Sequence, residues 1–222
     1  MTSMWRLLLL LAAAMLAHVA VSVSDSFQVA FSEQQLNAVE LKYGEQARKR
    51  VVAWVALIAD GRNQPDEEKL RLANDFFNLI PFVPDLQHWN KKDYWATPME
   101  LLGTGGGDCE DYSISKYFTL LAMGMESEKL KITYVKARGY GLINAAHMVL
   151  AYYPTPSAMP VVLDNLDGDI KPADKRGDLT PVYSFNGDGL WLARERGTGK
   201  RVDGGNRISL WRDMMTRMGK EI

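Results

Sequence analysis

The sequence predicts an α+β domain in which helices come first along the chain and an antiparallel sheet follows. Between residues 32 and 124, apolar side chains recur mostly at three- and four-residue steps, which is typical of helices with one buried face. From residue 131 onward, short runs rich in β-branched and aromatic residues alternate with turn-forming residues, which is typical of strands. With 222 residues, 47% of them hydrophobic, the chain can bury the core of one sizeable domain.

The first 22 residues have the parts of a secretory signal peptide. Arg6 supplies the positive charge, Leu7 to Ala17 form an uninterrupted apolar run of 11 residues, and small residues at 20 and 22 suit cleavage after Ser22. The alternative is a retained membrane helix, but Leu7 to Val23 holds only 17 residues, which is short for a hydrocarbon core of about 30 Å. We therefore expect a signal peptide at 1–22, a single domain at 23–222, and export from the cytoplasm.

Three helical regions are expected before the sheet. The first begins after Ser32, which can cap a helix, and is either one long helix or two helices joined near Gly44. The second covers residues 66–82 and ends near Pro81, because proline cannot continue a helix. Residues 83–107 are aromatic and irregular and are expected to form a loop, and the third helix runs from Asp108 to about Gly124.

Strands are expected in the second half of the chain, in the ranges 131–138, 147–153, 159–166 and 182–194. The residues Asn-Gly-Asp-Gly at 186–189 predict a turn between two strands within the last range. A short helix at 208–218 is expected to close the chain.

The charge balance argues against nucleic acid as a partner. Lysine and arginine number 26 against 27 aspartate and glutamate residues, so the formal net charge is −1. Nucleic-acid-binding proteins commonly present an excess of positive charge to the phosphate backbone. We therefore expect no nucleic-acid partner.

Cys109 is the only cysteine of the chain, so it cannot form an internal disulfide. It follows a glycine-rich stretch, GTGGG at 103–107, and lies where the third helix is expected to begin. A helix N-terminus stabilises a negative charge, which favours the reactive thiolate form of cysteine. Nearby backbone N–H groups could also supply part of an oxyanion hole. Cys109 is therefore either a nucleophile or a buried structural residue beside Asp108, which can cap the helix.

A thiol nucleophile needs a base, and the chain holds three histidines. His18 lies in the expected signal peptide, which leaves His88 in a polar loop and His147 at the start of an expected strand. If residues 147–166 form a hairpin that turns between residues 155 and 156, paired residues have numbers that sum to 311, and His147 lies opposite Asp164. Directly opposed residues are close enough for a carboxylate to orient an imidazole.

Three segments together resemble the bacterial transglutaminase-like cysteine proteinases: GTGGGDCEDYSISKYFTL at 103–120, AAHMVLAYY at 145–153 and VLDNL at 162–166. The resemblance runs through most of the chain after residue 22 and is most specific in GDCEDY at 107–112. It implies a papain/transglutaminase-like fold with the nucleophile at a helix N-terminus packed on the antiparallel sheet. Carried over by residue, it implies Cys109 as nucleophile, His147 as general base and Asp164 as the orienting acid.

Within this family, the chain looks most like periplasmic proteases that release large biofilm adhesins. That resemblance implies cleavage near the N-terminus of a repeat-rich adhesin, at a pair of alanines, in the periplasm. It also implies an inhibitor, the periplasmic domain of an inner-membrane receptor that responds to cyclic di-GMP. The aromatic segment from Trp89 to Trp95 is a candidate surface for that inhibitor by its composition alone.

The acids around Cys109 pose an electrostatic problem, because neighbouring carboxylates raise the pKa of a thiol. The resemblance implies Ca²⁺ as the cofactor that offsets them, and hard oxygen ligands suit this ion. Asp108 and Glu110 are the expected ligands, with Asp111 as a further candidate. The alternative is that Asp108 only caps the helix and that the other two acids are favourable first-turn charges.

Three functions remain open from the sequence. The first is an endopeptidase that forms a thioester at Cys109 and hydrolyses it. The second is a transglutaminase that keeps the same triad and transfers the acyl group to an amine. The third is a non-catalytic binding module, which has no chemical need for Cys109, His147 and Asp164 together.

Overall fold

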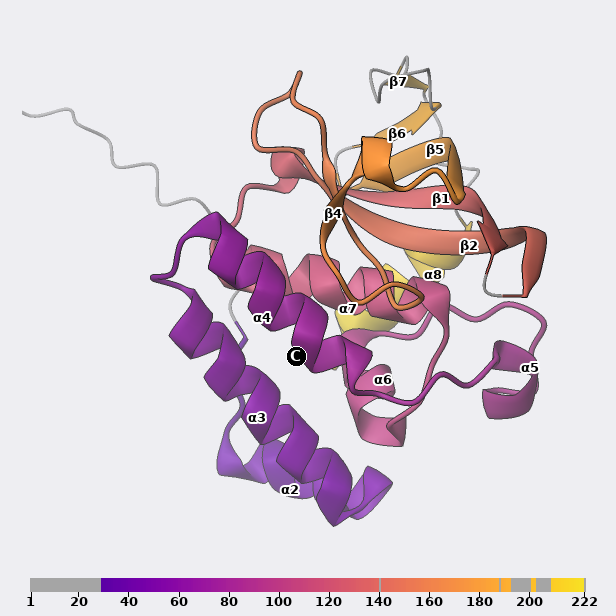
Figure 1. Ribbon diagram of the computed structural model, residues 1–222. Helices are drawn as coiled ribbons and strands as arrows, with labels where there is room; N and C mark the ends of the chain where they lie inside the picture. Colours follow the sequence, from indigo (N-terminus) through magenta and orange to yellow (C-terminus); the bar gives the residue numbers. More distant parts are fainter. Residues whose placement is uncertain (1–28, 140, 188, 193–200, 203–208, 222) are drawn as a thin grey trace, which may run out of the picture.

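The computed structural model of the protein describes residues 29–139, 141–187, 189–192, 201–202 and 209–221. Helices from the first half of the chain lie against the sheet that the second half forms (Figure 1). The expected α+β class, with helices packed on an antiparallel sheet, is confirmed. The signal peptide expected at 1–22 lies outside the described residues. Within the described ranges, no helix is long and apolar enough to cross a membrane.

The first helical region is two helices, α2 (Glu33–Tyr43) and α3 (Glu45–Gly61). The Ser32 hydroxyl accepts the backbone N–H of Gln35, which is the expected helix cap. Gly44 separates the helices with a φ of 92°, a conformation that glycine adopts without steric cost. Of the two alternatives that the sequence left open, the pair of helices joined at Gly44 is therefore correct.

The second expected helix is α4 (Asp66–Asn78), which ends three residues before Pro81. The loop expected at 83–107 was only partly right, because it contains α5 (Asp85–His88) and α6 (Pro98–Thr104). Thr97 and Glu100 form a reciprocal capping box at the start of α6. That box, followed by proline at the first helical position, is a recognisable start signal for a helix.

The third expected helix is α7 (Cys109–Ala122), the central helix of the domain. It packs against α4 and α6 on one side and against the sheet on the other (Figure 1). Of its 14 residues, 12 are buried, including several polar ones. Because α7 is enclosed on both sides, its N-terminus and Cys109 are held in place by the whole core.

The sheet has seven strands within the described residues, in the order β4-β3-β2-β1-β5-β6-β7, and neighbouring strands are antiparallel. The long strands β1 and β2 form its centre and face α7. The short strands β4 and β7 were not expected from the sequence. The strands are β1 (Leu130–Gly139), β2 (Leu142–Tyr152), β3 (Val161–Leu163), β4 (Lys171–Pro172), β5 (Leu179–Asn186), β6 (Gly189–Leu192) and β7 (Arg201–Val202).

The register expected for the β2–β3 hairpin was wrong by two residues. Ala151 lies opposite Val162, so paired residues sum to 313, and β3 ends at Leu163, before Asp164. Because side chains alternate between faces with a period of two, a shift of two residues leaves every side chain on its expected face. His147 and Asp164 are therefore not directly opposed, but they remain on the same side of the sheet.

The expected C-terminal helix is α8 (Ser209–Met218), which packs on the helical layer. Trp211 stacks on Phe118 of α7 with ring centroids 5.7 Å apart. Arg217 forms an ion pair with Glu100 of α6 and donates to the carbonyl of Trp95. The end of the chain therefore fixes α6 and the segment that leads into it.

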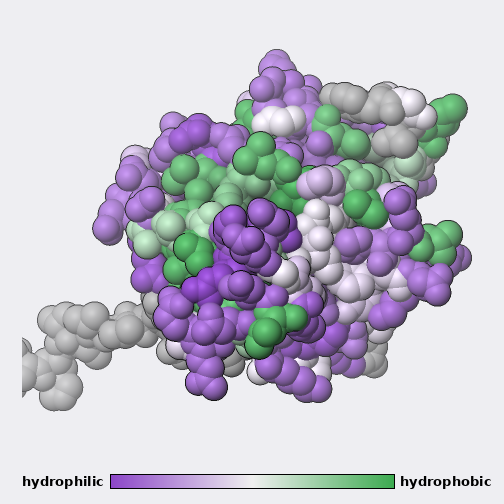
Figure 2. All heavy atoms as spheres, turned by 90° about the horizontal axis from the view of Figure 1, so that it is seen from below, coloured by the Kyte–Doolittle hydropathy of each residue, from purple (hydrophilic) through white to green (hydrophobic). Residues whose placement is uncertain are grey.

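The surface is mixed in polarity. On the face seen from below, hydrophilic side chains alternate with separate apolar patches (Figure 2). Leu79, Phe82 and Leu86, which lie between α4 and the end of α5, are more than half exposed, at 83%, 55% and 70%.

Candidate active site

Cys109 is the first residue of α7, as expected. α6 ends at Thr104 and is capped by Gly105, whose φ of 71° lies in the left-handed region that glycine adopts readily. Gly107 then pairs with Phe82 in an isolated bridge, and its carbonyl accepts the N–H of Val83. The glycine-rich segment thus turns sharply between two helices and is held by backbone hydrogen bonds just before the thiol.

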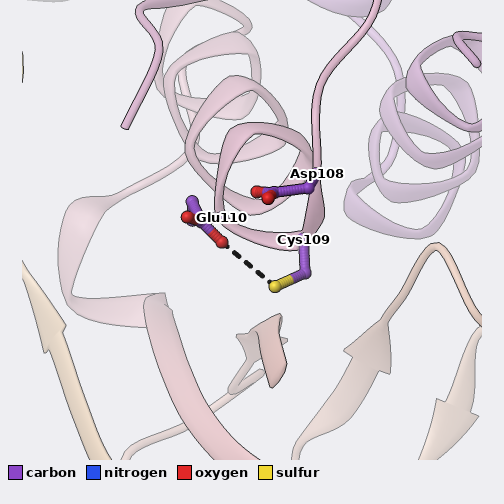
Figure 3. A group of neighbouring side chains, drawn as sticks. All are labelled: Asp108, Cys109 and Glu110. Atoms are coloured by element: carbon purple, nitrogen blue, oxygen red, sulfur yellow. Dashed lines mark hydrogen bonds between the residues drawn. The ribbon is translucent and has the colours of Figure 1, made fainter. Parts of the chain in front are cut away.

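The thiol points from the start of α7 toward the sheet (Figure 3). Sγ donates to Glu110 Oε2 over 3.1 Å, and the backbone of Met148 is close enough to the thiol to lower its pKa. Met148 follows His147 on β2, so Cys109 lies beside the strand that carries the expected base. Within the described residues, the side-chain hydrogen bond of the thiol goes to Glu110 and not to the His147 imidazole.

Burial is the largest cause that raises the pKa of the Cys109 thiol, and the carboxylates of Glu110 and Asp108 raise it further. The backbone of Met148 lowers the thiol pKa, but less than these groups raise it. Unless these acids are offset, burial and the acidic surroundings hold the thiol in its protonated form. The electrostatic problem that the sequence posed is therefore present in the structure.

His147 and Asp164 are brought together from β2 and from the loop after β3. His147 Nε2 lies 2.7 Å from Asp164 Oδ1, and their side chains are 5% and 0% exposed. His88 lies elsewhere, with its ring nitrogen 2.8 Å from Thr104 Oγ1. Of the two candidate histidines, His147 is the one that pairs with a buried carboxylate.

The Asp164 carboxylate accepts further hydrogen bonds that keep it ionised. Oδ1 also accepts the N–H of Leu166 at 3.0 Å, and Oδ2 accepts Arg176 Nη2 at 2.7 Å. Burial alone would raise the pKa of Asp164, but the hydrogen bonds from His147, Leu166 and Arg176 outweigh it and lower the pKa to about 2. Asp164 is therefore a fixed hydrogen-bond acceptor at neutral pH.

Acidic side chains gather on the other side of the α7 N-terminus. Figure 3 shows the Asp108 and Glu110 carboxylates facing each other beside Cys109. Carboxylate oxygens of Asp85 lie within 4.8 Å of carboxylate oxygens of Asp108 and of Glu110. A carboxylate oxygen of Asp93 lies within 4.8 Å of one of Glu110. Burial followed by the charge of Asp108 raises the pKa of Glu110 to about 10 and that of Asp85 to about 6.

These acids fit a hard divalent cation. One carboxylate oxygen of Asp85 and one of Asp108 are buried without a hydrogen-bond partner in the described part of the chain. Such buried unsatisfied oxygens are costly unless an ion or water fills the site. Four carboxylates offering oxygen ligands match the chemistry that calcium prefers. The expected ligands Asp108 and Glu110 therefore lie in a cluster that could hold Ca²⁺.

Asp111 has a different role from the other acids. Its Oδ2 accepts the N–H of Asp108 at 3.1 Å, and its Oδ1 accepts the N–H of Ala96 at 2.7 Å. Both oxygens are thus used to cap α7 and to tie it to the segment before α6. This is the structural alternative that the sequence left open, and for Asp111 the observed contacts favour it.

Three residues near the site were missed from the sequence. Asp85 and Asp93 fall in the segment expected to be an irregular loop, where only their acidic character was a signal. Arg176 lies 12 positions after Asp164 and follows the helical turn η3 (Ala173–Lys175). Its pairing with Asp164 depends on how the chain returns to the sheet, which no local pattern indicates.

The chain matches the family model of the bacterial transglutaminase-like cysteine proteinases over residues 62–179. This range contains the thiol, the histidine–aspartate pair and the acidic cluster. Among curated proteins, the search found no match.

Solved structures of LapG from Legionella pneumophila resemble the chain over most of its length. The calcium-bound form is 41% identical, with a TM-score of 0.71, and the alignment covers 85% of this chain and 99% of that one. The EGTA-treated form is 39% identical, with a TM-score of 0.72, over 86% and 99% of the two chains. A further LapG structure is 40% identical, with a TM-score of 0.72 and the same coverage. The resemblance first noted in three short segments thus extends to the fold, and the chain belongs to the bacterial transglutaminase-like cysteine proteinase family.

Proposed function

We propose that the protein is a cysteine endopeptidase in which Cys109 is the nucleophile, His147 the general base and Asp164 the acid that orients the imidazole. The observation that carries this proposal is the buried hydrogen bond between His147 and Asp164. His147 is followed on β2 by Met148, whose backbone lowers the pKa of the Cys109 thiol. Membership of a cysteine proteinase family supports the same chemistry.

In this proposal the two imidazole nitrogens have separate tasks. Asp164 takes the Nε2 side of the ring, so Nδ1 is left to exchange a proton with the thiol. In the proposed reaction, Nδ1 takes the thiol proton as sulfur attacks the scissile carbonyl carbon. His147 then gives that proton to the leaving amine as the carbon–nitrogen bond breaks and a thioester remains. Water, deprotonated by His147, attacks the thioester and releases the carboxylic acid and Cys109.

We propose that the acidic cluster binds Ca²⁺ through Asp108 and Glu110, with Asp85 and Asp93 as further ligands. Support comes from the unpartnered buried oxygens and from the existence of calcium-bound and EGTA-treated forms of the similar LapG. A bound divalent cation would neutralise the carboxylates that raise the pKa of the thiol. Occupied carboxylates would also compete less for the thiol proton.

The substrate, regulation and location proposed here rest on the resemblance to LapG. We propose that the protein acts in the periplasm, where it cuts the N-terminal region of a large repeat-rich adhesin near a pair of alanines and so promotes biofilm dispersal. We further propose that the periplasmic domain of a cyclic-di-GMP-responsive inner-membrane receptor inhibits it.

The decisive test is cleavage of the N-terminal fragment of a candidate adhesin by the chain from residue 23 onward. Wild type, Cys109→Ala and His147→Ala are compared, each with Ca²⁺ or EGTA, and His88→Ala serves as the matched histidine control. We expect cleavage only by wild type and His88→Ala, and faster with Ca²⁺. Cleavage that persists in Cys109→Ala would contradict the proposed nucleophile.

The products separate hydrolysis from acyl transfer. The reaction is repeated with an added primary amine, and the new C-terminus of the product is measured by mass spectrometry. A free carboxylate is expected, whereas an amide of the added amine would favour the transglutaminase alternative. If folded wild type cuts nothing, the proposed substrate is wrong and a binding role gains support.

A further inference from the structure

Arg176 lies on the side of Asp164 that faces away from His147. The two carboxylate oxygens have different partners: Oδ1 faces His147 Nε2 at 2.7 Å, and Oδ2 accepts Arg176 Nη2 at 2.7 Å. The arginine side chain is 2% exposed, so solvent does not replace this contact. The carboxylate is therefore held between one imidazole and one guanidinium group.

Arg176 is itself held by a second acid, Asp178. Arg176 Nε donates to Asp178 Oδ1 at 3.0 Å, and Nη2 donates to Asp178 Oδ2 at 2.8 Å. The carbonyl of Asp178 accepts the N–H of Arg138 on β1, which fixes this turn to the central strands of the sheet. A planar guanidinium that makes bidentate hydrogen bonds to one carboxylate has little freedom to rotate.

Stability alone is a weak reason to bury this arginine. Its Nη1 atom is buried without a hydrogen-bond partner in the described part of the chain. A buried ion pair loses hydration at both partners, and replacing such pairs by apolar residues is often neutral or stabilising. The free-energy cost of burying Arg176 is understandable if its ion pair with Asp164 fixes a side chain that takes part in the reaction.

Other charged groups surround Asp164 at greater distance. Asp167, in the same loop, lies 4.0 Å from Arg176 Nε. Lys116 of α7 reaches the region through Asn78 of α4, because Asn78 accepts from Lys116 Nζ and donates to the Asp164 carbonyl. Arg176 is therefore the cationic side chain that contacts the Asp164 carboxylate itself, whereas Lys116 supports the backbone of Asp164 through Asn78.

We propose that Arg176 is a positioning residue for the triad: by holding Asp164 Oδ2 it directs Oδ1 at His147 Nε2, which fixes the ring with Nδ1 available to Cys109. This inference rests on the proposed function, since it assumes that His147 acts as the base. Arg176 is buried and acts through Asp164, so its loss should affect catalysis more than substrate binding.

The test uses the chain from residue 23 onward, which retains only His88 and His147 of the three histidines. Imidazole nitrogens are labelled with ¹⁵N, and nitrogen–proton correlation spectra report which nitrogen carries the proton in each ring. His88→Ala assigns the two sets of signals. The variants are Arg176→Gln and Asp178→Asn, with Arg217→Gln as the control for loss of an unrelated partly buried arginine ion pair.

In wild type we expect one His147 tautomer with Nε2 protonated and a downfield N–H signal from its bond to Asp164. Arg176→Gln should weaken that signal and mix the tautomers without changing those of His88. On a cleaved substrate, kcat should fall roughly tenfold to a hundredfold, with KM changed less than about twofold. Arg217→Gln should change neither the His147 spectrum nor kcat.

Unchanged His147 signals and unchanged kcat in folded Arg176→Gln would overturn the proposal and leave a structural ion pair. If Arg176→Gln does not fold, Asp178→Asn decides, because it keeps the arginine and removes only its second anchor. For Asp178→Asn we expect a smaller loss of the His147 N–H signal and a smaller fall in kcat. A His147 spectrum identical to that of wild type would contradict the inference. The spectra need no substrate, so an uncut adhesin fragment would refute the proposed substrate without affecting this test.

Discussion

His147 and Asp164 form a 2.7 Å hydrogen bond although they are not paired on the β2–β3 ladder. Asp164 lies just beyond the end of β3, opposite no residue of β2, and its loop returns the carboxylate toward His147. Diagonal neighbours on one face are farther apart than opposed residues but remain within reach of long side chains. The contact therefore depends on the face that each side chain occupies rather than on direct pairing.

Asp164→Asn should reduce kcat/KM by roughly a hundredfold to ten-thousandfold, because an amide no longer stabilises the imidazolium and cannot serve both His147 and Arg176 as an acceptor. It should also lower the unfolding free energy by about 3 to 5 kcal/mol, since Arg176 loses a buried charge partner. Cleavage rates and urea unfolding measure the two effects. Asp167→Asn, which affects a more exposed ion pair with Lys171, is the control and should cost about 1 kcal/mol or less.

Cys109→Ala should abolish cleavage and leave the fold intact. The thiol is the proposed nucleophile, and among the described residues its side-chain hydrogen bond goes to the adjacent Glu110. Alanine keeps the Cβ atom and removes only the sulfur, so the contacts of α7 with the core remain. Circular dichroism and thermal unfolding of the variant check the fold, and the cleavage assay checks the chemistry. Residual cleavage above background in a folded variant would rule out Cys109 as the nucleophile.

Calcium should raise the melting temperature of wild type, and EGTA should reverse the rise. A ligand at a hundred times its dissociation constant stabilises the native state by about 2.7 kcal/mol. Glu110→Gln should weaken the calcium-dependent shift because it removes a charged oxygen ligand. Glu45→Gln is the control, since Glu45 is exposed and pairs only with Lys49 among the described ion pairs. A shift in Glu110→Gln equal to that of wild type would count against this ligand.

Lys116 should make stability rise with pH in the alkaline range. Burial lowers the pKa of Lys116 from 10.5 to about 7 in the folded protein. Between these values the unfolded chain binds more protons than the folded one, so raising the pH favours folding, by at most about 1.4 kcal/mol per pH unit. Urea unfolding at pH 7 to 10 measures the slope. Lys116→Met should make the unfolding free energy depend less steeply on pH than in wild type. Lys136→Met, at an exposed position of β1, should leave that slope unchanged.

Export should remove residues 1–22 and leave Val23 as the new N-terminus. The apolar run is short, and small residues stand at the positions that signal peptidase reads. Mass spectrometry of protein from the exported fraction measures the terminus. Ala20→Phe should block processing because it places a large side chain in a pocket for small ones. An intact N-terminus on the exported wild-type chain would instead favour the retained-helix alternative.

Local patterns in the sequence were sufficient for most of the fold. The cap at Ser32, the glycine at 44 and the helix that begins at Cys109 follow from interactions within a few residues. The capping box of α6 is also a local signal, but it lies within an aromatic stretch that otherwise has the composition of a loop. The strands β4 and β7, each of two residues, are too short to leave a periodic pattern.

For the candidate site, too, local sequence was sufficient for some features and not for others. By itself, the sequence determined which side chains are available: one thiol, few histidines, and acids beside the thiol at the start of a helix. Only the tertiary structure decided which of them meet. His147 and Arg176, the side-chain partners of the Asp164 carboxylate, lie 17 and 12 positions from it, and Asp85 lies 23 positions from Asp108. Such contacts depend on how loops return to the core, because side-chain distances across a fold are set by packing and not by local propensity.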